Sequence, residues 1–138
     1  MEYEEAKQKI IKFIGISKKT EYEVINKLKR MSVNNDDIEL IVNELKDFGY
    51  INDYDYVDSY IKQSKRLLKY SVFEIKQKLL QKGIKEDIIE PKVEQLYDIN
   101  YENEIILHII KSKSSFMDEV KLKKYLYNRG FKKTRLEE

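Results

Sequence analysis

Hydrophobic residues recur along this chain at intervals of three and four, separated by polar and charged residues. Near the start, Ala6, Ile10 and Ile14 follow this spacing. Intervals of three and four place side chains on one face of an α-helix, whereas a half-buried strand alternates at every second residue. The spacing therefore predicts an amphipathic helix over residues 3–14, ending near Gly15, a residue suited to a helix C-terminus.

The hydrophobic pattern of one later segment occurs twice along the chain. The stretch TEYEVINKL begins at Thr20, and SVFEIKQKL begins at Ser71, 51 residues further on. The match continues without a gap through Val33 with Ile84, Asp36 with Asp87, Ile38 with Ile89, Val42 with Val93, Leu45 with Leu96, and Tyr50 with Tyr101. Self-similarity at a fixed period predicts a repeated structural unit. Units of about 50 residues bury only a marginal core alone, so we expect neighbouring units to pack together.

Each copy opens with a helix-start signal. Thr20 is followed three residues later by Glu23, and Ser71 is followed in the same way by Glu74. In such a capping box the hydroxyl accepts a hydrogen bond from the third helical amide, and the glutamate accepts one from the cap amide. The second of these helices is expected to stop at Gly83, which can adopt the left-handed conformation.

The segment FGYIND predicts the end of one helix at Gly49 and the start of another at Asn52 or Asp53. The new helix would run to Lys69, about 16 residues and about 24 Å. A third copy begins near Phe116. It matches the second copy at an offset of 47 through Leu122, Leu126, Gly130 and Phe131.

These elements predict an all-α fold made of about three copies of a three-helix unit, the last one incomplete. One proline and four glycines leave little turn chemistry for a β-protein. The expected divisions are an N-terminal helix, a first three-helix repeat with a long linking helix, a second three-helix repeat, and a third repeat that reads as truncated. They cover residues 1–17, 18–69, 70–114 and 115–138.

The net charge of +2 hides alternating blocks of acidic and basic residues. Residues 36–58 carry eight acids and one lysine, while residues 61–82 carry seven basic residues and one glutamate. Residues 83–110 are again acidic, and residues 111–135 are strongly basic. Such blocks are typical of solvated helix faces, and they also suit a body that meets a charged polymer. Both interpretations stay open at this point.

The sequence contains few residues or motifs that could form a catalytic or metal-binding site. It contains no cysteine, and its only histidine, His108, lies in an apolar segment where we expect a buried or half-buried packing role. Asp53, Asp55 and Asp58 lack the mid-loop glycine and terminal glutamate of a calcium-binding loop. No phosphate-binding glycine motif and no HExxH motif is present. We therefore expect no enzyme, no catalytic residue, no metal site and no cofactor.

The first residues are acidic and contain no long apolar run. Signal peptides and membrane spans both need such a run. The sequence therefore predicts a cytoplasmic protein without membrane contact, and we expect a monomer.

Eleven tyrosines and five phenylalanines could form a stacking platform for single-stranded nucleic acid. Most sit at repeat-related or helix-ending positions and are expected in the core, among them Tyr22, Phe73, Phe48 and Phe131. The positions left open between core and surface are Tyr54, Tyr56 and Tyr60. Only four of the 27 basic residues are arginine, which disfavours sequence-specific duplex reading. Lysine-rich helices favour phosphates or an acidic protein surface.

Four segments of the sequence follow specific patterns of residue types. The hydroxyl-x-x-Glu-aliphatic start is filled by Thr20, Glu23, Val24, Lys27 and Leu28. The Gly-Tyr turn and the following helix are filled by Gly49, Tyr50, Ile51, Asp53, Tyr56 and Tyr60. In the second copy, Ser71 and Glu74 are followed by Ile75, Leu79, Lys82, Gly83 and Ile84. The last element is filled by Leu126, Arg129, Gly130 and Phe131. In these four segments the sequence resembles the RecX family of bacterial recombination regulators. Ser32 departs from the family, which usually has glycine there.

The resemblance implies tandem three-helix repeats in an elongated, curved body. It implies binding to the filament that RecA forms on single-stranded DNA, in the helical groove of that filament. It further implies suppression of RecA's ATP hydrolysis, strand exchange and co-protease activity, and hence control of recombination, DNA repair and the SOS response. The alternative is an independent helical module that binds DNA without sequence specificity through lysine-rich faces.

On either interpretation the expected contacts with a partner or with DNA are basic side chains. They are Lys62, Lys65, Arg66, Lys69, Lys76, Lys121, Lys123, Lys124, Arg129, Lys132 and Lys133.

Overall fold

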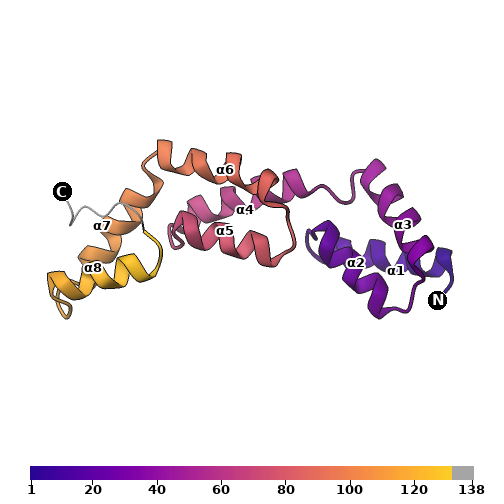
Figure 1. Cartoon of the computed structure of the whole chain (residues 1–138), viewed down its shortest axis with the longest axis horizontal. Helices are drawn as coiled ribbons and strands as arrows, with labels where there is room; N and C mark the ends of the chain where they lie inside the picture. The colour runs from indigo at the N-terminus through magenta and orange to yellow at the C-terminus, as the bar shows by residue number, and fades with distance from the viewer. Residues whose placement is uncertain (132–138) are drawn as a thin grey trace.

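The computed structural model describes residues 1–131, and within this range every regular element is an α-helix. The helices are α1 (Tyr3–Ile16), α2 (Glu21–Arg30), α3 (Asn35–Asp47), α4 (Asp53–Leu67), α5 (Val72–Gln81), α6 (Glu86–Asp98), α7 (Tyr101–Lys113) and α8 (Glu119–Asn128). The all-α prediction is confirmed. The helices form an elongated body with α1–α3 at one end and α7–α8 at the other (Figure 1).

Both predicted capping boxes are present. The Thr20 hydroxyl accepts from the Glu23 amide at 3.2 Å, and the Glu23 carboxylate accepts from the Thr20 amide at 3.0 Å. Ser71 and Glu74 do the same at the start of α5. Asn52 caps α4 by accepting from the amide of Asp55. Local residue chemistry thus determines where these helices begin.

Four helices end in the same turn, with one residue in the left-handed conformation, and Gly49 after α3 is one of these residues with φ 80°. Gly83 follows α5 with φ 80°, and Gly130 follows α8 with φ 88°. Ser32 holds the equivalent place after α2 with φ 60°, although it carries a Cβ. In each turn the next amide returns to a carbonyl of the last helical turn, for example Val33 to Leu28 at 3.2 Å. These contacts satisfy carbonyl groups that the helix leaves open.

The first helix ends near Gly15, as predicted, but Gly15 is not its C-terminal cap. The helix α1 runs through Gly15 to Ile16, and Ser17 ends it with extended backbone at φ −162°. Gly15 has no left-handed φ. Because Ile14 packs in the core, the helix has to continue at least to this point.

The buried side chains form two separate cores. The first lies between α1, α2 and α3 and includes Ile51 from the following turn. The second joins α4, α5, α6, α7 and α8, and the long helix α4 enters it through Val57 and Ile61. The helix α4 therefore packs with the two helices that follow it. The division into sequence repeats stays a prediction, since the repeat begins at the second helix and the packing group begins at the first.

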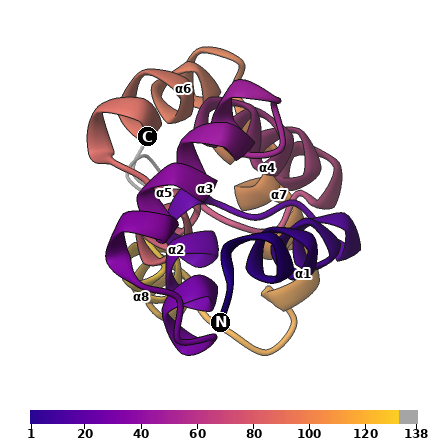
Figure 2. The same cartoon turned by 90° about the vertical axis from the view of Figure 1, so that its right-hand side faces the viewer.

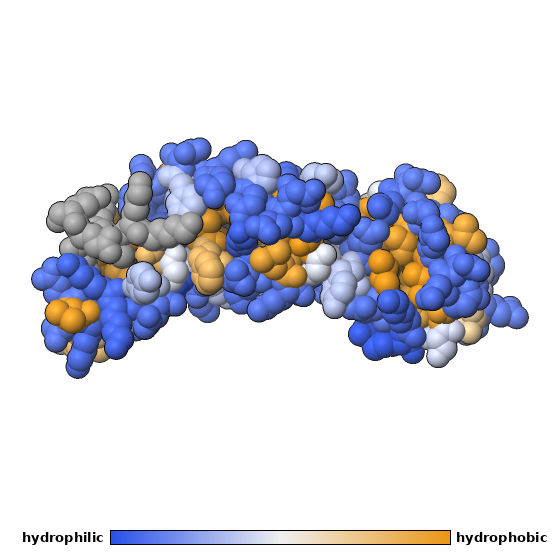
Figure 3. Space-filling model, in the orientation of Figure 1, coloured by the Kyte–Doolittle hydropathy of each residue, from blue (hydrophilic) through white to orange (hydrophobic). Residues whose placement is uncertain are grey.

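Seen along its length, the body is compact in cross-section, with α1–α3 in front of the other helices (Figure 2). The space-filling view shows a mostly hydrophilic face with separate hydrophobic patches, and an indented outline beside the α1–α3 lobe (Figure 3). No helix in the described part of the chain is both long and apolar enough to cross a membrane.

Candidate functional site

The second half of α4 presents a row of basic side chains. Lys62, Lys65 and Arg66 are exposed, and no ion pair with another described residue holds them. Their spacing of three and four residues brings them together on one side of the helix. Lys69, just beyond α4, is also exposed, and its Nζ lies 5.6 Å from the centre of the Tyr70 ring. We call Lys62, Lys65, Arg66 and Lys69 the basic row.

Two of the predicted contact residues are engaged inside the protein. Lys76 forms ion pairs with Glu86, at 3.1 Å, and with Glu90, and its hydrogen bonds to these carboxylates raise the pKa of its ammonium group. Arg129 pairs with Glu74 at 2.8 Å and donates to the carbonyl of Lys69. Their internal partners compete with any external one.

The helix α8 carries a second set of basic residues. Lys121 and Lys124 are exposed, while Lys123 lies 3.9 Å from Glu119 one turn earlier. Lys132 and Lys133 fall outside the residues that the structure describes. Together with the basic row, these side chains give the described body two exposed basic areas.

The α1–α3 lobe meets the second core through the first turn of α2. The Thr20 hydroxyl donates to the carbonyl of Lys82 at 2.7 Å, across 62 residues of sequence. Glu23 reaches the ammonium group of Lys82 at 3.5 Å. The ring of Tyr22 covers Gly83 so closely that an added Cβ would lie 2.2 Å from it. We call Thr20–Glu23 the first donor turn and Lys82–Gly83 the first acceptor turn.

The same arrangement occurs between α5 and the end of α8. The Ser71 hydroxyl donates to the carbonyl of Arg129 at 2.7 Å, and Glu74 pairs with the Arg129 guanidinium. Phe73 covers Gly130, where an added Cβ would lie 2.7 Å from it. Ser71–Glu74 is the second donor turn and Arg129–Gly130 the second acceptor turn. Each capping box thus also docks one part of the body on the next.

A carboxylate from the intervening helix completes each contact. Asp53 at the start of α4 accepts from the Glu21 amide at 3.0 Å, and Glu102 in α7 accepts from the Val72 amide at 2.7 Å. Both amides belong to helix first turns, where donors lack intrahelical partners. Burial raises the pKa of Asp53, and the hydrogen bond from the Glu21 amide opposes that shift.

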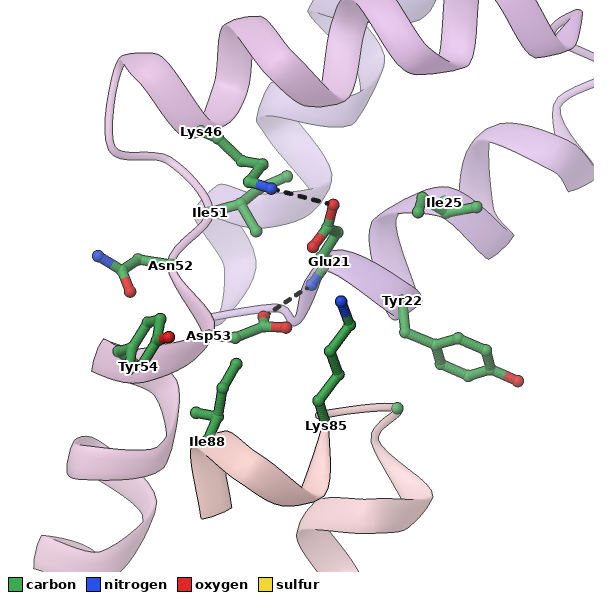
Figure 4. Close-up of a pocket in the computed structure, with 11 residues that line it drawn as sticks. Glu21, Tyr22, Ile25, Lys46, Ile51, Asn52, Asp53, Tyr54, Lys85 and Ile88 are labelled. Atoms are coloured by element: carbon green, nitrogen blue, oxygen red, sulfur yellow. Dashed lines mark hydrogen bonds and ion pairs between the residues drawn. The ribbon is translucent and has the colours of Figure 1, made fainter. Parts of the chain in front are cut away.

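An open groove of about 600 Å³ lies beside the first donor turn. Glu21 lies in the groove, where its carboxylate is 3.4 Å from the Nζ of Lys46. Lys85, at the start of α6, points toward Glu21 and Asp53 (Figure 4). Ile25, Ile51 and Ile88 supply apolar wall. With acids and lysines in balance, the groove has no single-sign charge to attract a charged ligand.

Several aromatic residues that were expected in the core lie at the surface. Tyr22 is 49% exposed, Phe73 47% and Phe48 72%, whereas Phe131 is buried as predicted. Tyr22 and Phe73 lie over the glycine turns at Gly83 and Gly130, outside the buried cores. Phe48 directly follows α3 and points away from the first core.

The three tyrosines that the sequence left open between core and surface fall into two groups. Tyr54 is exposed, while Tyr56 and Tyr60 are half-buried and stack with ring centres 6.5 Å apart. Burial raises the pKa of both stacked tyrosines. They belong to the second core's edge and do not form a free stacking platform.

The packing role predicted for His108 is wrong. His108 is exposed on α7, and the buried residues of that helix are Tyr101, Glu102, Ile105, Ile106 and Ile109. The apolar run IILHII is longer than the face that the helix buries. Within the described residues no group of histidine and carboxylate side chains could hold a metal ion.

Comparisons with known proteins agree on one family. The chain is 33% identical over 132 residues to the regulatory protein RecX of Caldanaerobacter subterraneus, covering 95% of this chain and 66% of that protein. It is 35% identical over 113 residues to the regulatory protein RecX of Streptococcus agalactiae, covering 73% of this chain and 44% of that protein. The chain belongs to the RecX family.

Solved RecX structures have the same fold. The crystal structure of RecX from Lactobacillus salivarius superposes with a TM-score of 0.80 at 26% identity, over 94% of this chain and 88% of that one. A second RecX crystal structure gives a TM-score of 0.78 at 23% identity, which supports the fold alone. No family model matches the chain. The chain spans 44 to 66% of the length of several curated RecX relatives.

Some of the residues that carry the RecX resemblance lie at the docking contacts, and others, such as Leu28, Leu79 and Phe131, lie in the two cores. Thr20 and Glu23 form the first donor turn, and Lys82 and Gly83 form the acceptor turn against it. The sequence showed these residues as helix caps and helix ends. Their second role was missed because a cap motif does not reveal which carbonyl its hydroxyl will meet across the fold.

Proposed function

We propose that this chain is a non-enzymatic regulator of RecA that binds the RecA filament on single-stranded DNA and suppresses ATP hydrolysis, strand exchange and co-protease activity. Membership of the RecX family supports the regulatory role. The observation that carries the proposal is the basic row, exposed on a long helix in the middle of an elongated body. Through this role the protein modulates recombination, DNA repair and the SOS response.

The basic row is suited to phosphate groups or to acidic side chains of a filament. Lysine binds phosphate mainly as a point charge, and each phosphate neutralised releases counterions. The basic row ends close to the end of α8, because the Arg129 guanidinium donates to the carbonyl of Lys69, so the two basic areas lie in the same part of the elongated body (Figure 1). A ligand of this shape lies in the groove of a filament and contacts more than one subunit, so that it blocks their movement.

The second candidate is a helical module that binds DNA by itself. It is favoured by the same exposed lysines and by Lys121 and Lys124 on α8. The two functions differ in whether the chain binds DNA strongly when RecA is absent. Backbone binding to bare DNA weakens steeply with salt, with a slope set by the number of phosphates neutralised.

A binding titration separates the two functions. Labelled chain is titrated with bare single-stranded DNA and with preformed RecA filaments on the same DNA, over a series of salt concentrations. The regulator predicts binding to filaments at salt concentrations where bare DNA no longer binds. Equal binding to both, with the same salt slope, would leave the independent DNA module as the better account.

A further inference from the structure

The two docking contacts use one set of residue types. Each donor turn offers a hydroxyl at the cap, an aromatic two residues later, and a glutamate after that. Each acceptor turn offers a basic residue whose backbone carbonyl accepts a hydrogen bond from the hydroxyl. A glycine follows it and leaves room for the aromatic side chain. Three contacts recur at both places, between positions that the sequence repeat relates. Chance proximity does not explain such a match.

A third turn of the donor kind begins α8, but its residues are different. Asp118 caps the helix by accepting from the Lys121 amide at 2.9 Å. An ionised carboxylate has no proton to donate to a carbonyl and repels its oxygen. Val120, at the aromatic position, is 76% exposed, and Lys121 replaces the glutamate. This turn starts a helix well but lacks every group that docks.

The first turn of the acceptor kind also differs. After α2 the cation is replaced by Met31 and the glycine by Ser32. At the two true acceptor turns an added Cβ would lie 2.2 and 2.7 Å from the covering aromatic ring or its Cβ. The Cβ of Ser32 therefore occupies the space that a docking aromatic needs, and Met31 offers no charge to a glutamate.

We propose that the donor and acceptor turns form a docking code, and that its absence from the two outer turns prevents a second copy of this chain from docking head to tail. A donor surface at one end and an acceptor surface at the other would make a heterologous contact. Heterologous contacts that do not close extend into open filaments. The outer turns carry an unfavourable element in each case: the Asp118 carboxylate would face a carbonyl oxygen, and the Cβ of Ser32 occupies the space that a docking side chain needs.

The code is tested by restoring it at the ends. The donor variant carries Asp118→Ser, Val120→Phe and Lys121→Glu; the acceptor variant carries Met31→Arg and Ser32→Gly. Each variant alone is expected to sediment as a monomer, like the parent chain. An equimolar mixture at millimolar concentration is expected to form a one-to-one complex, because each molecule then has one usable surface. High concentration is needed since the two parts are not tethered.

A reciprocal experiment tests the code within one chain. The residues of the α8 turn are placed in the first donor turn as Thr20→Asp, Tyr22→Val and Glu23→Lys. The helix α2 should persist, because the same residues cap α8. The sequence has no cysteine, so spin labels can be introduced at Lys12 in α1 and Glu94 in α6, both exposed. The distance between the labels should become longer and more widely distributed at unchanged helicity.

Two results would overturn the proposal. One is an unchanged label distance in the reciprocal variant, since the docking contact would then not depend on these residues. The other is head-to-tail association of the parent chain, detected by sedimentation and by cross-links between α8 and the turn after α2. A mixture of correctly folded donor and acceptor variants that remains monomeric would also count against it.

Discussion

Gly49 and Gly83 have the same left-handed backbone with φ 80° but different surroundings. A Cβ added at Gly49 meets nothing within 4 Å, whereas one added at Gly83 overlaps the Tyr22 ring. Gly49→Ala should therefore cost only the conformational penalty, about 1–2 kcal/mol in the free energy of unfolding. Gly83→Ala should cost about 1–3 kcal/mol more, because the docking contact must shift. Urea unfolding of both variants measures the difference.

Tyr22→Ala provides the control for this pair. It removes the ring that an alanine at position 83 would meet, so the double variant should lose only the conformational part of the Gly83→Ala penalty. Equal costs for the two glycine variants would show that Tyr22 yields without loss and that the close contact has no energetic weight.

Ser32 is a non-glycine residue in a conformation that glycine prefers. Its φ of 60° carries a steric cost for any residue with a Cβ. Ser32→Gly should stabilise the chain by up to about 1 kcal/mol, although glycine also gains entropy in the unfolded state. Thermal unfolding monitored by circular dichroism tests this. A loss of stability would mean that the serine side chain contributes a compensating contact.

At the scale of the helices, Tyr101 ties the start of α7 to the connection between α4 and α5. Its hydroxyl donates to the carbonyl of Tyr70 at 2.6 Å, and the side chain is 2% exposed. Tyr101→Phe should lower the free energy of unfolding by about 1–2 kcal/mol at neutral pH, because one buried acceptor loses its donor.

This effect should depend on alkaline pH. Burial, and next the charge of Glu102, raise the pKa of Tyr101 above its ordinary value of 10. A raised pKa in the folded state gives stability that is present below pH 10 and is lost as pH rises, since only the unfolded chain then releases the proton. The stability gap between the parent chain and Tyr101→Phe should therefore narrow above pH 10. A constant gap would contradict the buried neutral phenol.

The helix boundaries could largely be predicted from sequence because their causes are local. Thr20 with Glu23, Ser71 with Glu74, and Asn52 identify helix starts within four residues, and Gly83 identifies a helix end. The exposure of His108 could also have been predicted from the sequence. On a helical projection Ile105, Ile106 and Ile109 share one face, and His108 falls outside it.

The docking contacts could not be predicted in the same way. The Thr20 hydroxyl meets a carbonyl 62 residues away, and Ser71 meets one 58 residues away. Which residues meet across such separations depends on how the helices pack together, and no local sequence pattern encodes that packing. For the same reason the sequence showed Lys76 and Arg129 as free basic residues, although carboxylates inside the fold pair with both.

For the whole molecule, the proposed function assigns contact with the filament to the basic row. The triple change Lys62→Glu, Lys65→Glu and Arg66→Glu should weaken RecA filament inhibition at least tenfold, since it reverses three exposed charges that the proposed function places against the partner. Helicity should be unchanged because none of the three is held by an ion pair with another described residue. Inhibition is measured on RecA strand exchange.

The control for this change makes the same charge reversal elsewhere. Lys12→Glu in α1, with Lys29→Glu and Arg30→Glu in α2, also reverses three exposed basic residues. Inhibition by this variant should fall much less. If both variants lose inhibition equally, total charge and not the basic row determines binding.

The most direct test of the proposed function is the ATP hydrolysis of RecA on single-stranded DNA, with this protein added well below the RecA concentration. We expect hydrolysis to fall at these low ratios, because one regulator bound in the filament groove affects many RecA subunits. Hydrolysis that stays unchanged until the protein is present in sufficient amount to cover the DNA would contradict regulation of the filament and indicate simple competition for phosphate.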